Sequence, residues 1–167
     1  VVQLLAELGQ TDKIEPYCQR AGFQENYLEN LPPILQVSGV AARCYVKSLI
    51  EQKSMEELDM ISIMDLFTRY RYLKEITTLV LDNINGDDPS TSNIQTKLLE
   101  MNLMAAPQIA DTIFQNDMLR HFDRPRIGKL CEQAGLFVRA LQIFESFEDI
   151  RRVLCHASAI PPELVVE

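Results

Sequence analysis

The helical period of apolar residues, which recurs along almost the whole chain, constrains the fold more than any other sequence feature. Residues 95–111, QTKLLEMNLMAAPQIAD, show it best, because they indicate the end of one helix, a tight break and the start of a second helix. On the second helix the apolar residues follow the i, i+3, i+4, i+7, i+8 spacing: Ala106, Ile109, Ala110, Ile113 and Phe114. Pro107 suits the first turn of that helix, where its missing N–H donor would have no partner anyway. The segment therefore predicts a helical hairpin.

The same period continues on both sides of this hairpin, for example at Leu73, Ile76, Val80, Leu81 and Ile84, and again at Ile127, Leu130, Cys131 and Ala134. No strand-like alternation competes with it, so we expect about ten or eleven short helices. Turns after Leu8, near Tyr70 and at Gly135 are separated by 62 and 64 residues, roughly two hairpins each. This spacing predicts an all-α fold, an α-solenoid of short antiparallel helical hairpins with units of about 30 residues.

Two places interrupt the pattern. Pro32 and Pro33 remove two backbone donors, so we expect the helix to break or kink sharply there. Residues 83–93, NINGDDPSTSN, have the composition of an exposed loop and are the expected site of proteolytic nicking.

Because a solenoid is stabilised by packing between hairpins, four apolar residues are expected to lie in the core: Leu99, Leu103, Ile109 and Leu130.

Composition excludes several classes of function. Hydrophobic residues make up 47% of the chain, which disfavours intrinsic disorder, and the formal charge of -8 disfavours binding to nucleic acid or to anionic lipid surfaces. The four widely spaced cysteines, Cys18, Cys44, Cys131 and Cys155, are typical of reduced thiols in the cytosol. We expect no secretory leader from this sequence, and it has no apolar run long enough to cross a bilayer. It begins at Val1 without a Met, so we expect a fragment of a longer protein.

Residues able to carry chemistry are few. His121 and His156 are the only histidines, and Cys155 and His156 would lie roughly 100° apart on a helix, too far round it to form a nucleophilic pair. A zinc site built from Cys131, Cys155 and His121 would match no familiar ligand spacing. Nucleotide-binding and protease motifs are absent. We therefore assign no catalytic, cofactor-binding or metal-binding residue, and we expect the protein not to be an enzyme.

Charged and sulfur-containing clusters have simple explanations. Glu56, Glu57 and Asp59 precede an expected helix, where acidic residues interact favourably with the helix dipole. Three basic clusters are interpreted as solvated outer faces: Arg69, Arg71 and Lys74; Arg124, Arg126 and Lys129; Arg151 and Arg152. The methionines are expected mostly in the core: Met55, Met60, Met64, Met101, Met104 and Met118.

Three sequence blocks resemble a known family. LLEMNLM (98–104), APQIAD (106–111) and HFDRPRIGKLCEQAGLFVRAL (121–141) resemble the clathrin heavy-chain family, near the junction of its N-terminal propeller and its leg. Upstream, LGQTDKI (8–14) and LFTRYRYLKEI (66–76) agree more loosely with it. The resemblance implies one continuous helical-repeat segment over residues 1–167. Residues 1–82 would be the linker and first hairpins, 83–93 an exposed loop, and 94–167 ankle-like hairpins.

The resemblance also implies a function, that of a structural scaffold segment of a vesicle coat in clathrin-mediated endocytosis and intracellular vesicle transport. The implied partners are other heavy chains, with light chains and adaptors bound mostly outside this segment. A groove between helices could accept a helical or short apolar adaptor peptide, at residues that the sequence does not identify. The expected location is the cytoplasmic face of coated pits and vesicles, with no membrane insertion and with the isolated segment monomeric.

Three other interpretations remain open at the level of sequence. The first is a helical-repeat interaction module of a vacuolar sorting or tethering subunit. The second is a helical-repeat RNA-binding protein, which would need a basic concave face. The third is an all-helical enzyme, which would need a deep polar pocket around Cys155 and His156.

Overall fold

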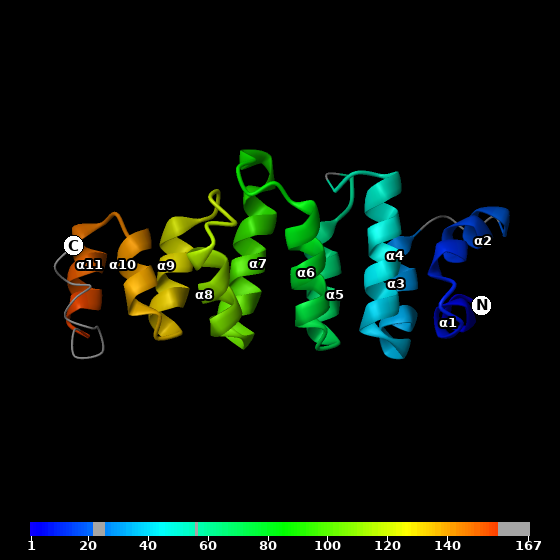
Figure 1. The fold of residues 1–167 in the computed structure, drawn as a ribbon, viewed down its shortest axis with the longest axis horizontal. Coiled ribbons are helices and arrows are strands. Elements are labelled where there is room, and N and C mark those ends of the chain that lie inside the picture. The colour runs from blue at the N-terminus through cyan, green and yellow to red at the C-terminus, as the bar shows by residue number, and fades with distance from the viewer. Residues whose placement is uncertain (22–25, 56, 157–167) are drawn as a thin grey trace. The chain divides into compact units, whose positions relative to one another are not determined.

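Helices account for all the regular secondary structure of residues 1–21, 26–55 and 57–156, which are the residues described by the computed structural model (Figure 1). These ranges contain eleven α-helices and two short 3₁₀ helices, and no β-strand. The prediction of an all-α fold of about ten or eleven short helices is confirmed. The chain divides into two compact units, Val1–Asn83 and Ile84–Glu167.

The first unit is built from six α-helices and one 3₁₀ helix: α1 (Val2–Glu7), η1 (Thr11–Lys13), α2 (Ile14–Arg20), α3 (Tyr27–Val37), α4 (Gly39–Gln52), α5 (Met60–Arg69) and α6 (Leu73–Asn83). Helix α3 packs on α4, which follows it, and also on α5, while α4 packs on α6. Helices α3 and α4 thus contact both each other and the equivalent helix of the next hairpin. This is the packing of an α-solenoid.

The second unit is also a series of helices packed on their neighbours. It contains η2 (Pro89–Thr91), α7 (Ser92–Ala105), α8 (Pro107–Gln115), α9 (Arg124–Gln133), α10 (Phe137–Ile143) and α11 (Phe147–Leu154). Helix α7 packs on α8 and on α9, α9 packs on α10, and α10 packs on α11. Pro107 occupies the first turn of α8, as the sequence predicts. None of the described helices is both long and apolar enough to span a membrane.

One type of turn ends a helix in both units. At Gly9, Arg71 and Gly135 the residue after the helix C-cap has a positive φ, of 69°, 67° and 78° respectively. In each case its N–H bonds back to the carbonyl three residues earlier, and the next N–H bonds to the carbonyl five residues before it, which is the Schellman motif. These positions lie 62 and 64 residues apart, so the turns expected from the sequence are confirmed. Asp117, with φ 50°, forms a fourth turn of this type.

The break expected at Pro32 and Pro33 is wrong, because α3 runs without interruption from Tyr27 to Val37 through both prolines. The missing donors cost on the order of 3 kcal/mol for an interior helix proline. Three residues of the same helix, Leu31, Ile34 and Leu35, are at most 1% exposed. Since burial of each such side chain stabilises the fold by about 1.5–3 kcal/mol, packing against α4 and α5 outweighs the cost.

The predicted core residues are confirmed only in part. Leu99 and Leu103 are buried, whereas Ile109 and Leu130 are half-buried at the sides of α8 and α9. The methionines are also less buried than expected: Met60, Met64 and Met101 lie in the core, Met55 is half-buried, and Met104 and Met118 are exposed. The expectation that most of them lie in the core is therefore wrong, since only three of the six do.

Arg71 supports a prediction about stability. Because a residue with a Cβ in the left-handed region is strained by roughly 1–2 kcal/mol, and glycine loses about 0.4–1 kcal/mol more backbone entropy on folding, Arg71→Gly should stabilise the protein by a net ~0.5–1 kcal/mol. Chemical denaturation monitored by circular dichroism measures the difference.

Arg71→Ala is the matched control, because it removes the same charge but keeps the strained backbone. It should not stabilise the protein. A gain in stability as large as that of Arg71→Gly would show that charge, and not backbone strain, is the cause.

Candidate functional site

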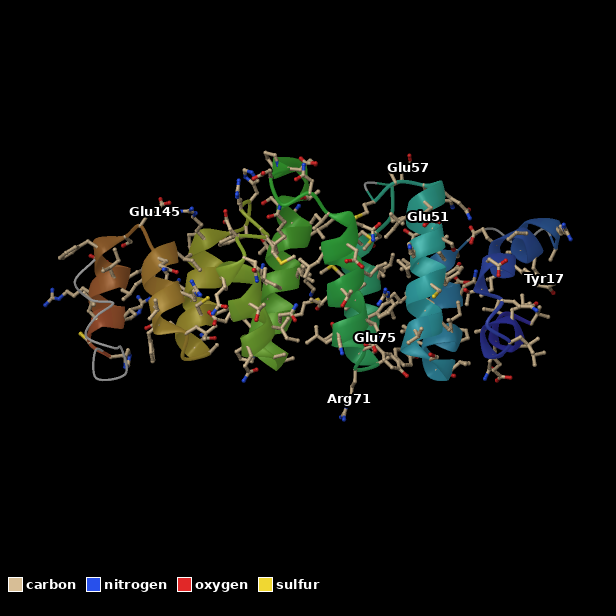
Figure 2. The ribbon with its side chains drawn as sticks, viewed as in Figure 1. Tyr17, Glu51, Glu57, Arg71, Glu75 and Glu145 are labelled. Atoms are coloured by element: carbon tan, nitrogen blue, oxygen red, sulfur yellow. The ribbon has the colours of Figure 1, made fainter. Side chains whose placement is uncertain are left out.

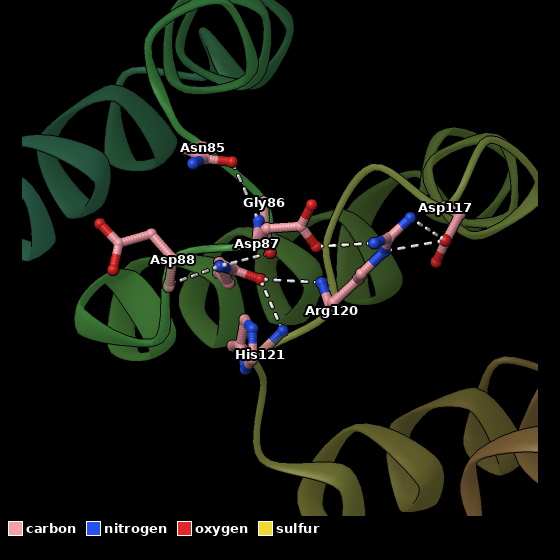
Figure 3. A network of polar contacts seen from close by, with 8 residues as sticks. Asn85, Gly86, Asp87, Asp88, Asp117, Arg120 and His121 are labelled. Carbon is pink, nitrogen blue, oxygen red and sulfur yellow. Dashed lines mark hydrogen bonds and ion pairs between the residues drawn. The ribbon is translucent and has the colours of Figure 1, made fainter.

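A polar network in the second unit surrounds the side chain of Gln95 on α7. Figure 3 shows the loop residues that take part, among them Gly86, Arg120 and His121. Gln95 is completely buried. Its Nε2 donates to the Gly86 carbonyl at 3.2 Å, to the Asp88 carbonyl at 3.3 Å and to the Thr91 hydroxyl at 3.0 Å. Its Oε1 accepts the backbone N–H groups of Arg120 at 3.1 Å and His121 at 2.9 Å. One amide side chain therefore joins two loops, residues 84–91 and 116–123.

Further contacts fasten the same two loops. The Arg120 N–H also donates to the Gly86 carbonyl, at 3.2 Å. A Cβ at Gly86 would collide with the carbonyl oxygen of Met118, so only glycine allows this approach of the two backbones. At the surface the Arg120 guanidinium bridges Asp87 at 2.8 Å and Asp117 at 2.7 Å (Figure 3). We call residues 84–91, 116–123 and Gln95 the loop clamp.

Next to the loop clamp, Thr96 ties the start of α9 to α7. Its hydroxyl accepts the N–H of Asp123 at 2.9 Å and donates to the Ser92 carbonyl at 2.8 Å. Asp123 is the N-cap of α9 and accepts the Arg126 N–H at 3.0 Å. The entry of α9 is therefore set by side chains of α7.

Three arginine–carboxylate pairs connect helices two places apart. Arg126 of α9 binds both oxygens of Glu100 on α7, at 2.7 and 2.8 Å. Arg139 of α10 binds Asp111 of α8 at 2.7 Å, and Arg152 of α11 binds Glu132 of α9 at 2.9 Å. We call these three pairs the ion-pair ladder.

The ion-pair ladder joins equivalent helices of successive hairpins: α7 to α9, α8 to α10, α9 to α11. The Arg139–Asp111 pair is the least solvated, with side-chain exposures of 20% and 30%. A fourth pair, Arg124–Glu145, is largely exposed and lies between the start of α9 and the α10–α11 loop. Two of the basic clusters were expected to be solvated outer faces. This is wrong for Arg126 and Arg152, which form ion pairs with carboxylates of the preceding hairpin.

The first unit holds a buried polar cluster of its own. The Tyr45 hydroxyl on α4 donates to Glu15 of α2 at 3.3 Å and accepts from the Asn30 amide of α3 at 3.5 Å. Glu15 is only 5% exposed and lies 3.8 Å from the ammonium of Lys53. Burial, with the nearby Glu15 charge, raises the pKa of Tyr45 well above its ordinary value. The phenol therefore stays neutral and links three helices.

The structure does not bring the sequence-predicted reactive residues together in one place. His121 lies in the loop clamp, whereas the exposed His156 ring stacks on Phe137, with centroids 5.4 Å apart. Cys155 is exposed beyond α11, and burial raises the pKa of the Cys131 thiol in α9 to about 12. No group of three or more His, Cys, Asp or Glu side chains among the described residues could hold a metal ion.

The acidic cluster near residue 57 behaves as a helix start. Asp59 is the N-cap of α5 and accepts both the amide and the hydroxyl of Ser62, at 3.1 and 2.7 Å, which lowers the pKa of its carboxyl. Glu57 is exposed just before it, and Glu56 lies outside the described residues. The interpretation of this cluster as part of a helix start is confirmed at Asp59.

Gln95 is not among the site residues predicted from the sequence, although the sequence contains a signal for it. The signal is its register. Gln95, Leu98, Leu99 and Asn102 follow the i, i+3, i+4, i+7 spacing and all are buried, so two amides occupy positions where apolar residues are expected. A buried amide needs several hydrogen-bond partners, and such a position predicts a polar network.

A family model described as "Region in Clathrin and VPS" matches residues 51–163. The match covers more than half of the chain and includes α5 to α11. The chain therefore belongs to the family of helical-repeat regions found in clathrin and VPS proteins.

Relatives refine this assignment. The chain is 42% identical to "Probable clathrin heavy chain 1" of Caenorhabditis elegans, over 99% of the chain and 10% of that protein. It is 37% identical to "Clathrin heavy chain 2" of Oryza sativa subsp. japonica, over 100% of the chain and 10% of that protein. It is 35% identical to "Clathrin heavy chain 2" of Homo sapiens, over 99% of the chain and 10% of that protein. The chain spans about a tenth of the length of these relatives.

The resemblance to the clathrin heavy-chain family, inferred from residues 98–141, is confirmed by these relatives. A vacuolar sorting or tethering subunit, the main alternative, is not favoured. The α-solenoid fold class agrees with the matching family.

The loop clamp gives a prediction about local stability. Gln95→Leu keeps the side-chain volume but leaves several buried backbone groups without partners, so we expect a loss of roughly 2–4 kcal/mol in the free energy of unfolding. Hydrogen exchange of the Arg120 and His121 amides should accelerate more than that of the α10 amides. Residues 84–91, held by Gln95 in the native protein, should become the first site of proteolysis.

Gln133→Leu, an exposed substitution of the same type on α9, serves as the control and should change neither quantity. Unchanged exchange of the Arg120 and His121 amides in Gln95→Leu would contradict the role given to the loop clamp.

The ion-pair ladder gives a second prediction. A double-mutant cycle on Arg139 and Asp111 should yield a coupling free energy of about 1–2 kcal/mol, because the pair is short and half-desolvated. The same cycle on the exposed Arg124–Glu145 pair should yield less than about 0.5 kcal/mol. Equal coupling energies in the two cycles would show that solvent exposure does not set the strength of these pairs.

Proposed function

We propose that this chain is a segment of the leg of a clathrin-type heavy chain and acts as a structural element of a vesicle coat in endocytosis and intracellular transport. Its membership of the clathrin and VPS family and its similarity to clathrin heavy chains along its length support the proposal. The single observation that carries it is the packing of helices with the next helix and the next but one, because this lets a segment extend by adding hairpins.

Within this proposal, residues 1–167 belong to one continuous run of hairpins. Residues 1–82 form the linker and first hairpins, 83–93 a connecting loop, and 94–167 ankle-like hairpins. The protein works on the cytoplasmic face of coated pits and vesicles. The helix end at Asn83 and the helix start at Ser92 fit a connection at this place.

The mechanism is mechanical. Apolar contacts hold each hairpin on its neighbour, while the loop clamp and the ion-pair ladder set the angle between hairpins. Small rotations at these contacts would change the curvature of the leg, and with it the size of the coat. The residues that bear on function are therefore those between hairpins, and we assign the segment no catalytic reaction.

The proposed partners are other heavy chains, and light chains and adaptors bound mainly elsewhere on the parent protein. One hollow of about 400 Å³ in the second unit has room for part of a short apolar adaptor peptide. It is lined by Leu136, Phe137 and Val138 beside the Arg139–Asp111 pair. An apolar side chain would meet the first three residues, and a backbone amide would meet the carboxylate.

The test is the size distribution of coats assembled from the parent heavy chain. Arg126→Gln, Arg139→Gln and Arg152→Gln together remove the ion-pair ladder while leaving the apolar core intact. Softer contacts between hairpins should broaden the distribution of cage diameters measured by electron microscopy.

Arg151→Gln is the control for the loss of a positive charge, because Arg151 is exposed on α11 and has no carboxylate partner among the residues described. It should leave the diameters unchanged. If the triple variant assembles cages with the native distribution, the ion-pair ladder does not set leg curvature.

A further inference from the structure

Exposed side chains of opposite charge lie toward the two ends of the α4–α5–α6 arrangement in the first unit. Because α5 runs antiparallel to its neighbours, the α4–α5 loop and the α5–α6 turn lie at opposite ends of these helices. Glu51 and Glu57 lie at one end, and Arg71 and Glu75 at the other (Figure 2). We call Glu51 and Glu57 the acidic end, and Arg69, Arg71 and Lys74 the basic end.

The cations of the basic end differ from the arginines of the second unit in their ion pairing. Arg69, Arg71 and Lys74 are all exposed, and among the residues described none of them forms an ion pair. In the second unit, by contrast, five arginines each bind a carboxylate: Arg120, Arg124, Arg126, Arg139 and Arg152. The half-buried Glu75 in the first turn of α6 is the nearest acidic residue in sequence, so the cluster keeps an excess of positive charge.

Interaction with a helix dipole accounts for a cation at position 69, but not for the cations at Arg71 and Lys74. Arg69 lies in the last turn of α5, where a cation interacts favourably with the helix dipole. Lys74 lies in the first turn of α6, where the dipole disfavours a cation. Arg71 has a φ of 67° at a position where glycine is relaxed, as Gly9 and Gly135 show in the equivalent turns.

Neighbouring packing holds the basic end in place. The Tyr72 ring lies over the backbone of Gly39, occupying the space that a Cβ at residue 39 would take. Gly39 is the first residue of α4, so the α5–α6 turn is fixed against the α3–α4 turn. The Arg71 side chain consequently projects from a rigid base (Figure 2).

The acidic end also carries a charge that does not stabilise its own helix. Glu51 lies in the last turn of α4, where the dipole disfavours an anion, and Lys47 approaches it only to 4.0 Å. Glu57 is exposed in the loop before α5. Asp59, in contrast, is used as the cap of α5 and is left out of this surface. The Glu57 carboxylate, and that of Glu51 beside its exposed pairing with Lys47, are thus accessible to a partner.

We infer that the basic end binds the acidic end of a second copy of this chain, head to tail. The inference rests on the proposed coat function and names one contact between heavy chains. Guanidinium groups bind carboxylates through paired hydrogen bonds, so Arg69 and Arg71 are suited to Glu51 and Glu57. A head-to-tail contact does not close on itself, and it can repeat along an extended assembly.

A second copy fits better than an anionic membrane or nucleic acid. The chain carries a net charge of -8, so an extended anionic surface such as a membrane or nucleic acid would repel it. Two carboxylates on a second copy attract the basic end and bring a much smaller repulsion. With so few charges, the contact is weak and screened by salt, since the Debye length is about 8 Å at physiological ionic strength. A dilute isolated chain is therefore monomeric, and the contact matters where copies are concentrated in a coat.

Sedimentation equilibrium of the 167-residue chain at millimolar concentration and low salt tests the inference. The wild type should self-associate, and physiological salt should weaken the association. The basic-end variant Arg71→Glu/Lys74→Glu and the acidic-end variant Glu51→Lys/Glu57→Lys should each lose about tenfold or more in affinity for themselves. An equimolar mixture of the two variants should associate again, because each then presents the charge that the other lacks.

The control is Lys129→Glu/Arg151→Glu, which changes net charge by the same amount as the basic-end variant but lies on α9 and α11, outside both ends. It should associate like the wild type. Circular dichroism is used to check that each variant is folded. Arg71→Gly is a further variant that should weaken association while the fold is kept.

Three results would overturn the inference: a wild type that stays monomeric at low salt, a control variant that loses as much affinity as the basic-end variant, or a mixture of the two reversed variants that does not associate. None of them would decide the coat function, because that is measured by cage diameters of the parent protein. Native cages formed by the basic-end variant in the parent would exclude this contact and leave the coat function standing.

Discussion

The structure depends on one packing constraint, that each helix must bury its apolar face against two others, its hairpin partner and the equivalent helix of the next hairpin. A helix of 7–14 residues, the length of most helices here, cannot form a core alone. The buried faces of α3 and α4 are therefore completed by α5 and α6, and that of α7 by α9. The described helices of each unit pack in successive pairs, so the energetics are those of a series of interfaces.

This constraint explains why so much of the fold could be predicted from the sequence. The i, i+3, i+4 spacing and the turn residues are local signals, and they give the helices, their order and the position of the Schellman turns at Gly9 and Gly135. They say less about which stripe is buried. On α4 the apolar residues Val40 and Cys44 share a helical spacing but are exposed, whereas Ala42, Val46 and Leu49 are buried. Small residues at Gly39 and Ala42 mark the true buried face, because they allow close approach of neighbouring side chains.

The candidate site was hardly predictable, for a physical reason. The partners of Gln95 and of the ion-pair ladder lie 20–28 residues away for the longest contacts, so no helical period connects them. The error at Pro32 and Pro33 has the same origin. The cost of a helix proline is local and visible in the sequence, but the compensation comes from burial of Ile34 and Leu35 by other helices.

The two kinds of contact between hairpins differ in how they respond to displacement, and this difference bears on elasticity. Apolar contacts lose much of their attraction when a gap of about 0.5–1 Å opens, so they hold hairpins in place but give little range of motion. Charged pairs weaken more gradually with distance and are screened by salt. A hairpin interface that combines a buried core with an arginine–carboxylate pair at its edge can therefore rotate slightly about the core while the pair still restrains it. The Arg126–Glu100 and Arg152–Glu132 pairs have this arrangement beside the buried Ile127 and Cys131 of α9, so under the proposed function they are the contacts at which we expect hairpins to rotate.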